Sequence, residues 1–452
     1  MPSNPTGTKV KNPNRKLENA WAMYDWANSS YNLVITSTIF PAYYVGVTQN
    51  AIPGEPNMVH FFGWKLANTV LQDYALGLVF LVVAFTSPIL SSIADYRGNK
   101  KVWLRWLSLL GAASCSMLFF FTPDKLEWGI IFFALAALGF WSSLVFYNSY
   151  LPDIVPLEDR DRVSAKGYTY GYIGSVLLQI ACFVLIIKPG WFGLDNGDGT
   201  LAPRISFLLV GFWWFGFAQI TLHAMPMKSR EHRHARKNIV MNGFRELRKV
   251  ADQVKVMPVL KRYLFSFFLY SVGVQTVMLV AAAFAKKEIF PDKKDEAKLL
   301  ITIILIQLIA IPGALLMSRL SKRIGNFNVL IAAVVVWVGI CFTAYYIQTQ
   351  TQLYILACII GLVMGGIQSM SRSTYSKLLP VTEDTTSFFS FYDVTEKLAL
   401  FIGLFLFGAI EQSTGNIRNS LWALMVAFIL GLFALIWTKR AAKMDGHAAI
   451  HD

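Results

Sequence analysis

Apolar stretches of about 20 residues recur along the whole chain and are separated by short polar loops. A helix of about 20 residues is long enough to cross the roughly 30 Å hydrocarbon core of a bilayer. The runs are continuous rather than alternating, so the pattern predicts membrane-spanning helices and not the strands of a barrel. The predicted spans, about twelve by this length rule, are 20–44, 73–94, 102–121, 128–151, 167–188, 204–225, 260–285, 298–318, 328–347, 353–373, 386–410 and 419–438.

Polar side chains interrupt the first predicted span at a helical spacing. Their positions follow i, i+3, i+4, i+7 and i+11, which is one face of a helix. Hydrocarbon satisfies neither a carboxylate nor an amide, so this face must meet water or a partner helix. We interpret it as the wall of a solute path. The residues on this face are Asp25, Asn28, Ser29, Asn32 and Thr36.

The composition is typical of a polytopic membrane protein. Of 452 residues, 55% are hydrophobic and only 15% are charged, whereas a soluble protein carries about 25% charged residues. The net charge of +14 comes from Lys and Arg that gather in alternate loops. This positive-inside pattern predicts that both termini and the central loop are cytoplasmic, and it makes a nucleic-acid partner unnecessary.

A basic segment, Pro226–Pro258, divides the spans into two sets of six, and we predict a short helix in it on the membrane surface. Residues 147–164 and 371–387 echo each other when Pro156 is aligned with Pro380. A repeat of six spans around a cytoplasmic linker is the layout of the major facilitator fold. The predicted division is 1–19 N-terminal tail, 20–225 N-terminal six-helix bundle, 226–258 basic linker, 259–438 C-terminal six-helix bundle and 439–452 C-terminal tail.

The stretch SSIADYRGNKK (91–101) resembles the loop signature of the major facilitator superfamily between its second and third spans. We predict a gating loop of Asp95, Arg97 and Gly98, in which the carboxylate accepts hydrogen bonds from a neighbouring helix N-terminus. The alternative is a solvated turn whose basic residues only determine topology.

Four segments together resemble one branch of that superfamily. They are WAMYDWANSSY (21–31), YNSYLPDI (147–154), GGIQSMSRS (365–373) and FFSFYDVTEK (388–397). The branch is that of the autophagy-related vacuolar amino-acid effluxers, and it includes a bacterial group labelled only as unknown major facilitators. The resemblance implies an all-α transporter with twelve transmembrane helices in two six-helix bundles. The amino-acid substrate belongs to the fungal members.

Charged residues inside spans are the first candidates for the solute and ion pathway. Asp25 either carries a proton or binds a cationic group, or it is a permanent structural partner. Asp393, Glu396 and Lys397 lie together in the eleventh span, where Asp393 and Lys397 are spaced to pair. Arg372 either holds a carboxylate or extends to the interface. One hypothesis joins Lys397 or Arg372 to Asp25 or Asp393 across the halves in one state only.

Uncharged polar residues complete the predicted pathway. They are Tyr172 and Gln179 in the fifth span, Gln368 in the tenth, and Tyr147 and Asn148 in the fourth. Tyr168, Ser175, Ser371, Tyr375, Gln275 and Gln307 are weaker candidates. Gly167, Gly171 and Gly174 allow a close helix approach, so the fifth-span residues serve either the solute or helix packing.

The predicted function is secondary active transport of a small polar or zwitterionic solute by alternating access. A proton is the simplest coupling ion, carried by Asp25 and by Asp393 or Glu396; the competing class is a receptor that kept a transporter fold. No nucleotide, zinc-hydrolase or serine-hydrolase motif is present, so we expect no enzyme, metal or cofactor. We expect a monomer in a bacterial inner membrane whose partners are the solute, a coupling ion and the bilayer.

Overall fold

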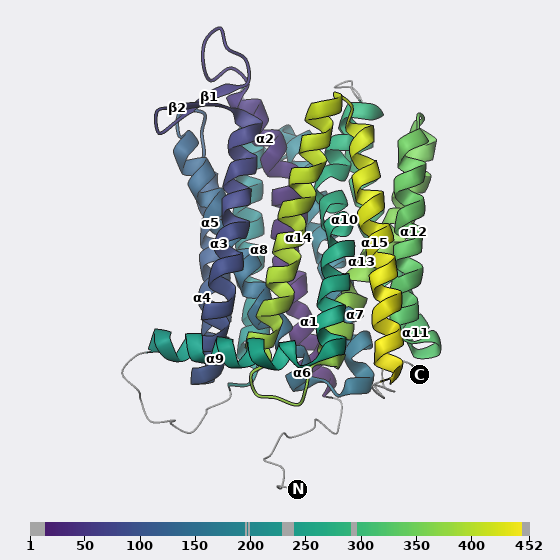
Figure 1. The fold of residues 1–452 in the computed structure, drawn as a ribbon. Helices are drawn as coiled ribbons and strands as arrows, with labels where there is room; N and C mark the ends of the chain where they lie inside the picture. The colour runs from purple at the N-terminus through teal and green to yellow at the C-terminus, as the bar shows by residue number, and fades with distance from the viewer. Residues whose placement is uncertain (1–13, 195–196, 198, 228–238, 291–295, 445–452) are drawn as a thin grey trace, which may run out of the picture.

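The computed structural model describes residues 14–194, 197, 199–227, 239–290 and 296–444. Its long helices run side by side in one bundle (Figure 1). The elements of residues 14–227, the N-terminal half, are α1 (Arg15–Ser30), η1 (Tyr31–Ile39), α2 (Phe40–Thr48), β1 (Met58–Phe61), β2 (Trp64–Ala67), α3 (Asn68–Arg97), α4 (Lys100–Met117), η2 (Leu118–Phe120), α5 (Leu126–Asn148), α6 (Leu151–Ile154), η3 (Leu157–Asp159), α7 (Arg160–Ile187), η4 (Pro189–Phe192) and α8 (Leu201–Ala224).

Residues 239–444 form the C-terminal half. Its elements are α9 (Ile239–Lys255), α10 (Pro258–Glu288), α11 (Glu296–Ile324), α12 (Asn326–Tyr346), α13 (Gln350–Leu378), α14 (Thr385–Thr414), η6 (Ile417–Asn419) and α15 (Ser420–Met444). Buried apolar side chains gather in two clusters, one mainly from each half. Some side chains of each half, such as Leu33 and Leu279, also pack against the cluster of the other half.

Ten helices in the described part of the chain are long and apolar enough to cross a membrane. Two predicted spans fall outside that set. The first is divided among α1, η1 and α2, and the eleventh, α14, carries Asp393, Glu396 and Lys397. Both are the spans whose polar content suggested a pathway.

The division of the first span is caused by a π-helix, Tyr31–Ile39. Its wider turns bond residue i to i+5, and π-helical turns are frequent at functional sites. The hydroxyls of Ser37 and Thr38 donate to the carbonyls of Asn32 and Leu33 at 2.8 and 2.9 Å. Because each wide turn holds an extra residue, the predicted polar face ends at Asn32. Thr36 is buried but does not line the cavity, so its predicted place on that wall is wrong.

A β-hairpin projects from one end of the bundle, and the sequence analysis did not predict it (Figure 1). β1 pairs antiparallel with β2, with Phe61 opposite Trp64. The two-residue turn, Phe62 and Gly63, has positive φ at both positions, 47° and 85°. Such turns usually carry Asn-Gly or Asp-Gly, so a turn with Phe62 at its first position could not be recognised from the sequence.

The predicted helix in the basic segment is confirmed as α9, which lies across the opposite end of the bundle (Figure 1). We call this end the α9 end. Val250 and Val254 of this helix are buried. Lys249 donates to Glu246 at 2.8 Å and to Asp384, which precedes α14, at 3.2 Å. His232 and His234 of the basic segment, which we interpret as part of a solvated linker rather than as a metal site, lie outside the described residues.

Candidate functional site

A cavity of about 80 Å³ lies between the two halves. Its walls come from α1, η1, α5 and α7 of the N-terminal half and from α10, α13 and α14 of the C-terminal half. Its apolar walls include Phe140, Trp141 and Met278. The polar residues that line it are Asp25, Asn28, Ser29, Asn32, Asn148, Tyr168, Tyr172, Gln275, Gln368, Arg372, Tyr392 and Glu396.

An ion pair crosses the cavity wall from one half to the other. Both terminal nitrogens of Arg372 on α13 lie 3.3 Å from Oδ2 of Asp25 on α1. The hydroxyl of Tyr147 donates to the same oxygen at 2.8 Å. Arg372 is only 2% exposed, so the interpretation that it extends to the membrane interface is wrong. The hypothesised pairing of Arg372 with Asp25 across the halves is thus present.

The rest of the Arg372 guanidinium is held by neutral groups of the N-terminal half. Its Nε donates to the Ser164 hydroxyl at 3.0 Å, and Nη2 donates to the Ser164 carbonyl at 2.9 Å. Nη1 donates to Asn148 Oδ1 at 3.1 Å. The rings of Trp21 and Tyr168 lie 4.8 and 4.3 Å from the guanidinium carbon. The cation is therefore held by aromatic faces and directed acceptors as well as by one carboxylate.

Glycines of α7 bring the helix close enough to α1 to build this site. A Cβ at Gly167 would overlap the Asp25 carboxylate, and one at Gly171 would lie 2.6 Å from Ser29 Oγ. At Gly174 it would lie 2.8 Å from the Trp26 carbonyl. The predicted close approach is confirmed. Its consequence is that the Asp25 side chain occupies space that any larger residue at position 167 would fill.

Asn28 offers the cavity an amide that no described residue satisfies. Its side chain is fully buried and lines the cavity next to Asp25. Among the described residues, neither its amide nitrogen nor its oxygen has a hydrogen-bond partner, and Oδ1 of Asn32 also lacks one. A buried polar group without a partner costs about 1–3 kcal/mol. Both amides are therefore suited to water or a polar solute in the cavity.

A second charge cluster lies on α14, where the predicted pairing of Asp393 with Lys397 is confirmed. Lys397 Nζ lies 3.1 Å from Asp393 Oδ1 and 2.8 Å from Glu396 Oε2. Gln275 donates to Glu396 Oε1 at 2.7 Å, and Ser87 of α3 donates to Asp393 at 3.1 Å. Two carboxylates thus share one ammonium. Glu396 lines the cavity, whereas Asp393 and Lys397 lie behind it.

Only some of the other predicted pathway residues line the cavity. Tyr172 donates to Gln368 Oε1 at 3.0 Å across the halves, and both line the cavity. Tyr147 does not line the cavity, but it contacts both ion-pair partners: its hydroxyl donates to Asp25, and its ring centroid lies 5.5 Å from the Arg372 guanidinium carbon. Gln179 lies outside it and accepts a hydrogen bond from Gln307 at 2.7 Å. The fifth span therefore serves both of its predicted alternatives, with tyrosines at the cavity and an amide in helix contact.

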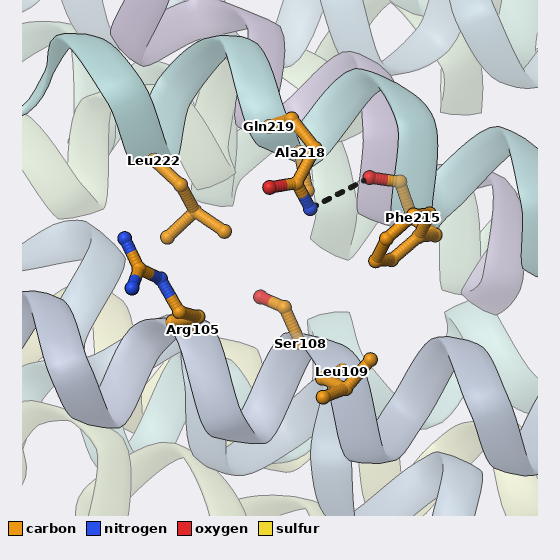
Figure 2. A pocket seen from close by; sticks show the side chains of 7 residues that line it. All are labelled: Arg105, Ser108, Leu109, Phe215, Ala218, Gln219 and Leu222. Atoms are coloured by element: carbon orange, nitrogen blue, oxygen red, sulfur yellow. Dashed lines mark hydrogen bonds between the residues drawn. The ribbon is translucent and has the colours of Figure 1, made fainter.

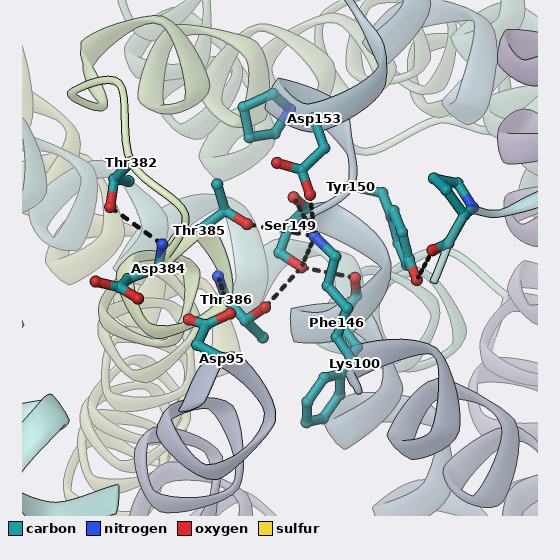
Figure 3. A network of polar contacts seen from close by, with 12 residues as sticks. Asp95, Lys100, Phe146, Ser149, Tyr150, Asp153, Thr382, Asp384, Thr385 and Thr386 are labelled. Carbon is teal, nitrogen blue, oxygen red and sulfur yellow. Dashed lines mark hydrogen bonds and ion pairs between the residues drawn. The ribbon is translucent and has the colours of Figure 1, made fainter. Parts of the chain in front are cut away.

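The predicted gating loop joins the halves at the α9 end (Figure 3). Asp95 accepts from the backbone N–H groups of Thr386 and Ser387 at 3.3 and 2.6 Å, at the N-terminus of α14. Gly98 ends α3 with φ of 68°, a conformation that favours glycine. Arg97 is exposed. The predicted acceptance of helix N-terminal hydrogen bonds is thus present, and we call this contact the first junction.

A second junction, at the same end, again joins a carboxylate of the N-terminal half to donors of the C-terminal half. Asp161, at the start of α7, accepts from Ser321 and Asn326 at 2.8 Å each. Lys377 donates to the same carboxylate at 2.7 Å. Ser321 lies in the last turn of α11 and Asn326 begins α12, so this junction lies beside the loop after the eighth predicted span.

Comparison with known proteins decides the family of this chain. A family model described as "Vacuole effluxer Atg22 like" matches residues 13–446. The chain belongs to the Atg22-like family. YxiO of Bacillus subtilis, described as an uncharacterized MFS-type transporter, is 28% identical over 434 residues, which cover 95% of this chain and 96% of that one. Autophagy-related protein 22 of Yarrowia lipolytica is 25% identical over 483 residues, covering 87% and 80%.

Solved structures show the same fold. The major facilitator superfamily transporter FucP, in an outward conformation, has a TM-score of 0.67 at 13% identity, covering 94% of this chain and 98% of that one. The proton:xylose symporter XylE has a TM-score of 0.69 at 14% identity, covering 93% and 94%. The predicted all-α major facilitator fold and Atg22-like branch are confirmed. This Atg22-like protein is a multi-pass integral membrane protein and a secondary transporter.

Several residues that build the site in this Atg22-like transporter were not among the sequence candidates. Asp161, Lys377 and Ser164 all contact the opposite half. A signal for the second junction was available. The alignment of Pro156 with Pro380 places Asp153 opposite Lys377, two residues of opposite charge, and Asp153 forms an ion pair with Lys100 (Figure 3). At these corresponding positions, Asp153 pairs with a lysine of its own half and Lys377 pairs with a carboxylate of the opposite half.

Removing the Asp95 carboxylate should loosen the first junction. In Asp95→Ala, the α14 N-terminus loses an anionic partner, an interaction worth up to about 2 kcal/mol when partly buried. We expect a cysteine at Ser92, which is buried beneath the junction, to react with a polar thiol reagent about tenfold faster in a background without the four native cysteines. Asp124→Ala, in an exposed loop, is the control. Unchanged labelling in Asp95→Ala would show that the junction does not limit access.

Proposed function

We propose that this Atg22-like transporter moves a small zwitterionic solute, such as an amino acid, by alternating access and with proton coupling. The observation that carries the proposal is the Asp25–Arg372 ion pair on the wall of a cavity between the halves. A zwitterion can replace both partners at once. Its carboxylate takes the planar fork of Arg372, and its ammonium takes Asp25. The Asn28 amide then supplies a donor and an acceptor to the solute.

When the solute replaces the ion pair, neither Asp25 nor Arg372 is left without an oppositely charged partner. Breaking a buried pair by removing one partner is strongly unfavourable, because it leaves an uncompensated charge. When the solute leaves, Asp25 and Arg372 return to each other across the halves. An empty transporter can therefore close, and a transporter holding a zwitterion can close as well. A solute with only one charge leaves one of the two residues without compensation, so it is disfavoured.

Contacts on both sides of the cavity suit alternating access. At the α9 end the halves meet through the two hydrogen-bonded junctions. Toward the other end, Leu279, Leu300, Ile304 and Leu404 of the C-terminal half pack against the apolar cluster of the N-terminal half. We propose that these two zones separate in turn. In both junctions a carboxylate of the N-terminal half, Asp95 or Asp161, accepts hydrogen bonds from the C-terminal half, which favours closure in a single register.

The α14 cluster supports Glu396 as the proton carrier, ahead of Asp25. Asp25 is matched by one cation, Arg372, whereas Asp393 and Glu396 share Lys397. With every group ionised, the cluster holds one excess negative charge in the membrane interior. One proton neutralises it and lowers the cost of closing the cavity. Glu396 is the member that lines the cavity, so a proton can reach it from the solute path. Tyr392 and Gln275 line the cavity beside it.

The remaining parts of the proposal concern the oligomeric state, the membrane and the orientation of the protein in it. We propose a monomer in a bacterial inner membrane, with the α9 end and both termini in the cytoplasm. The support is the gathering of Lys and Arg in the tails and in the loops of that end. The exposed residues Arg245, Arg248 and Lys255 of α9 suit a surface of anionic lipids.

A thermal-shift screen with a transport assay tests the solute class. Purified protein is heated with amino acids, with their decarboxylated amines, and with their deaminated acids. We expect zwitterions to raise the melting temperature and both single-charge analogues to fail, since a ligand at 100 times its Kd stabilises by about 2.7 kcal/mol. The stabilising amino acid should then exchange across proteoliposomes. Stabilisation by amines or sugars alone would contradict the solute class, and binding without exchange would favour the receptor alternative.

A further inference from the structure

A second cavity, of about 120 Å³, lies between α4 and α8, away from the solute site. Figure 2 shows its walls, with Arg105, Ser108 and Leu109 from α4 facing Phe215, Gln219 and Leu222 from α8. Nothing in the transport proposal uses this cavity. Its walls combine one cation and one amide with apolar side chains, which is unlike the mainly polar solute site.

The cavity opens toward the outer, lipid-facing side of the bundle. Leu109 and Phe215 on its rim are 38% and 47% exposed, and Trp106 beside it is 62% exposed. Exposed large apolar side chains on membrane-spanning helices contact acyl chains rather than water. A molecule that enters from this side comes from the bilayer.

Among the described residues, the charge in this cavity has no counterion. Arg105 is exposed, and among the described residues it has no hydrogen bond to a side chain and no ion pair, whereas other arginines of this end, such as Arg162, have carboxylate partners. No acidic residue lines the cavity. Gln219 donates one amide hydrogen to the Phe215 carbonyl at 3.1 Å, and its second amide hydrogen remains for a ligand. The site therefore selects an anion.

The polar part and the apolar part of the cavity lie at different depths in the membrane. Arg105 lies five residues from the start of α4 at Lys100, and Gln219 lies five residues before the end of α8 at Ala224. At 1.5 Å per residue, both lie about 8 Å from the α9 end, near the headgroup boundary. Leu109 and Phe215 lie one turn deeper. The headgroup and the acyl chain of one lipid would lie in the same order, with the headgroup nearer the α9 end.

We propose that the cavity between α4 and α8 binds one anionic phospholipid. Its phosphate contacts the Arg105 guanidinium and the Gln219 amide, and an acyl chain passes between Leu109 and Phe215. Basic pockets between transmembrane helices bind anionic headgroups in this manner. The floor residue, Ser108, shares a hydrogen bond of 2.6 Å with Tyr24, which precedes Asp25 in α1. Lipid occupancy therefore braces α4 against the helix that carries the solute site.

Native mass spectrometry of the full chain in detergent tests the site. The probes are phosphatidylglycerol, phosphatidylcholine and the soluble glycerol 3-phosphate. We expect one phosphatidylglycerol per chain to be retained, with phosphatidylcholine and glycerol 3-phosphate retained about tenfold less. Equal retention of glycerol 3-phosphate would make this a free-phosphate site and overturn the lipid assignment. Equal retention of phosphatidylcholine would overturn selection by charge.

Matched variants separate a built site from general attraction to anionic lipid. Arg105→Gln should weaken phosphatidylglycerol retention about tenfold, and Leu109→Trp should weaken it by filling the acyl path without changing the charge. Arg440→Gln removes an exposed cation of α15 and should retain lipid like the unaltered protein. Equal losses in Arg105→Gln and Arg440→Gln, or no loss in Arg105→Gln, would overturn the proposal. A melting temperature measured without added lipid shows whether each variant is folded.

Discussion

Asp25→Asn is expected to destabilise the protein by about 3–5 kcal/mol and to abolish transport, because it leaves the buried Arg372 guanidinium without its anion. The Ser164 and Asn148 acceptors remain, but they are neutral. In the double variant Asp25→Asn, Arg372→Gln the uncompensated charge is gone. We expect it to recover more than half of the lost free energy of unfolding. Transport should stay absent in both, since neither variant holds a zwitterion by both charges.

Reversible unfolding in detergent and amino-acid exchange in proteoliposomes measure the two effects. Asp252→Asn is the matched control, because its pair with Lys255 is on the exposed face of α9, at 2.9 Å. Such surface pairs contribute about 0–1 kcal/mol. If the double variant is less stable than Asp25→Asn, the loss arises from packing rather than from an unpaired charge. If Asp25→Asn transports normally, Asp25 is not part of the solute site.

Local pattern was enough to predict the polar wall but not the partner across it. The spacing of Asp25, Asn28 and Asn32 identified one helix face, because helical periodicity acts over a few residues. Arg372 lies 347 residues away from Asp25, and nothing in its own span distinguishes a buried arginine from an interfacial one. Its burial depends on Gly167, which lets α7 and α1 meet around the pair. Tertiary packing of this kind is not encoded in the periodicity of any single span.

The irregular parts of the fold could not be predicted from the sequence, for a different reason. The π-helix at Tyr31–Ile39 changes the number of residues per turn without any Pro or Gly inside it, so a constant helical spacing assigned Thr36 to the wrong face. The hairpin turn at Phe62 and Gly63 uses a residue that rarely adopts positive φ. The regular spans, the surface helix and the gating loop were predictable, because length, charge and an acidic residue beside a turn determine them directly.

Glu396→Gln is expected to separate solute exchange from the proton gradient. The substitution keeps the shape of the side chain and imitates its protonated form, leaving Asp393 alone to balance Lys397. The cluster is then neutral as long as Asp393 and Lys397 are both ionised. Exchange of labelled for unlabelled amino acid across proteoliposomes should continue. Accumulation driven by an imposed pH step should disappear, and with it the response of transport to pH.

The control for Glu396→Gln lies on the same helix. Glu411 pairs with Lys287 at 2.8 Å near the far end of α14, outside the cavity. Glu411→Gln should keep full proton-driven accumulation. Asp393→Asn should behave differently from Glu396→Gln, because Asp393 does not line the cavity and accepts a hydrogen bond from Ser87 of the other half. Accumulation that survives in Glu396→Gln would rule out this residue as the carrier. The Asp25–Arg372 solute site would be unaffected by that result, because exchange tests it separately.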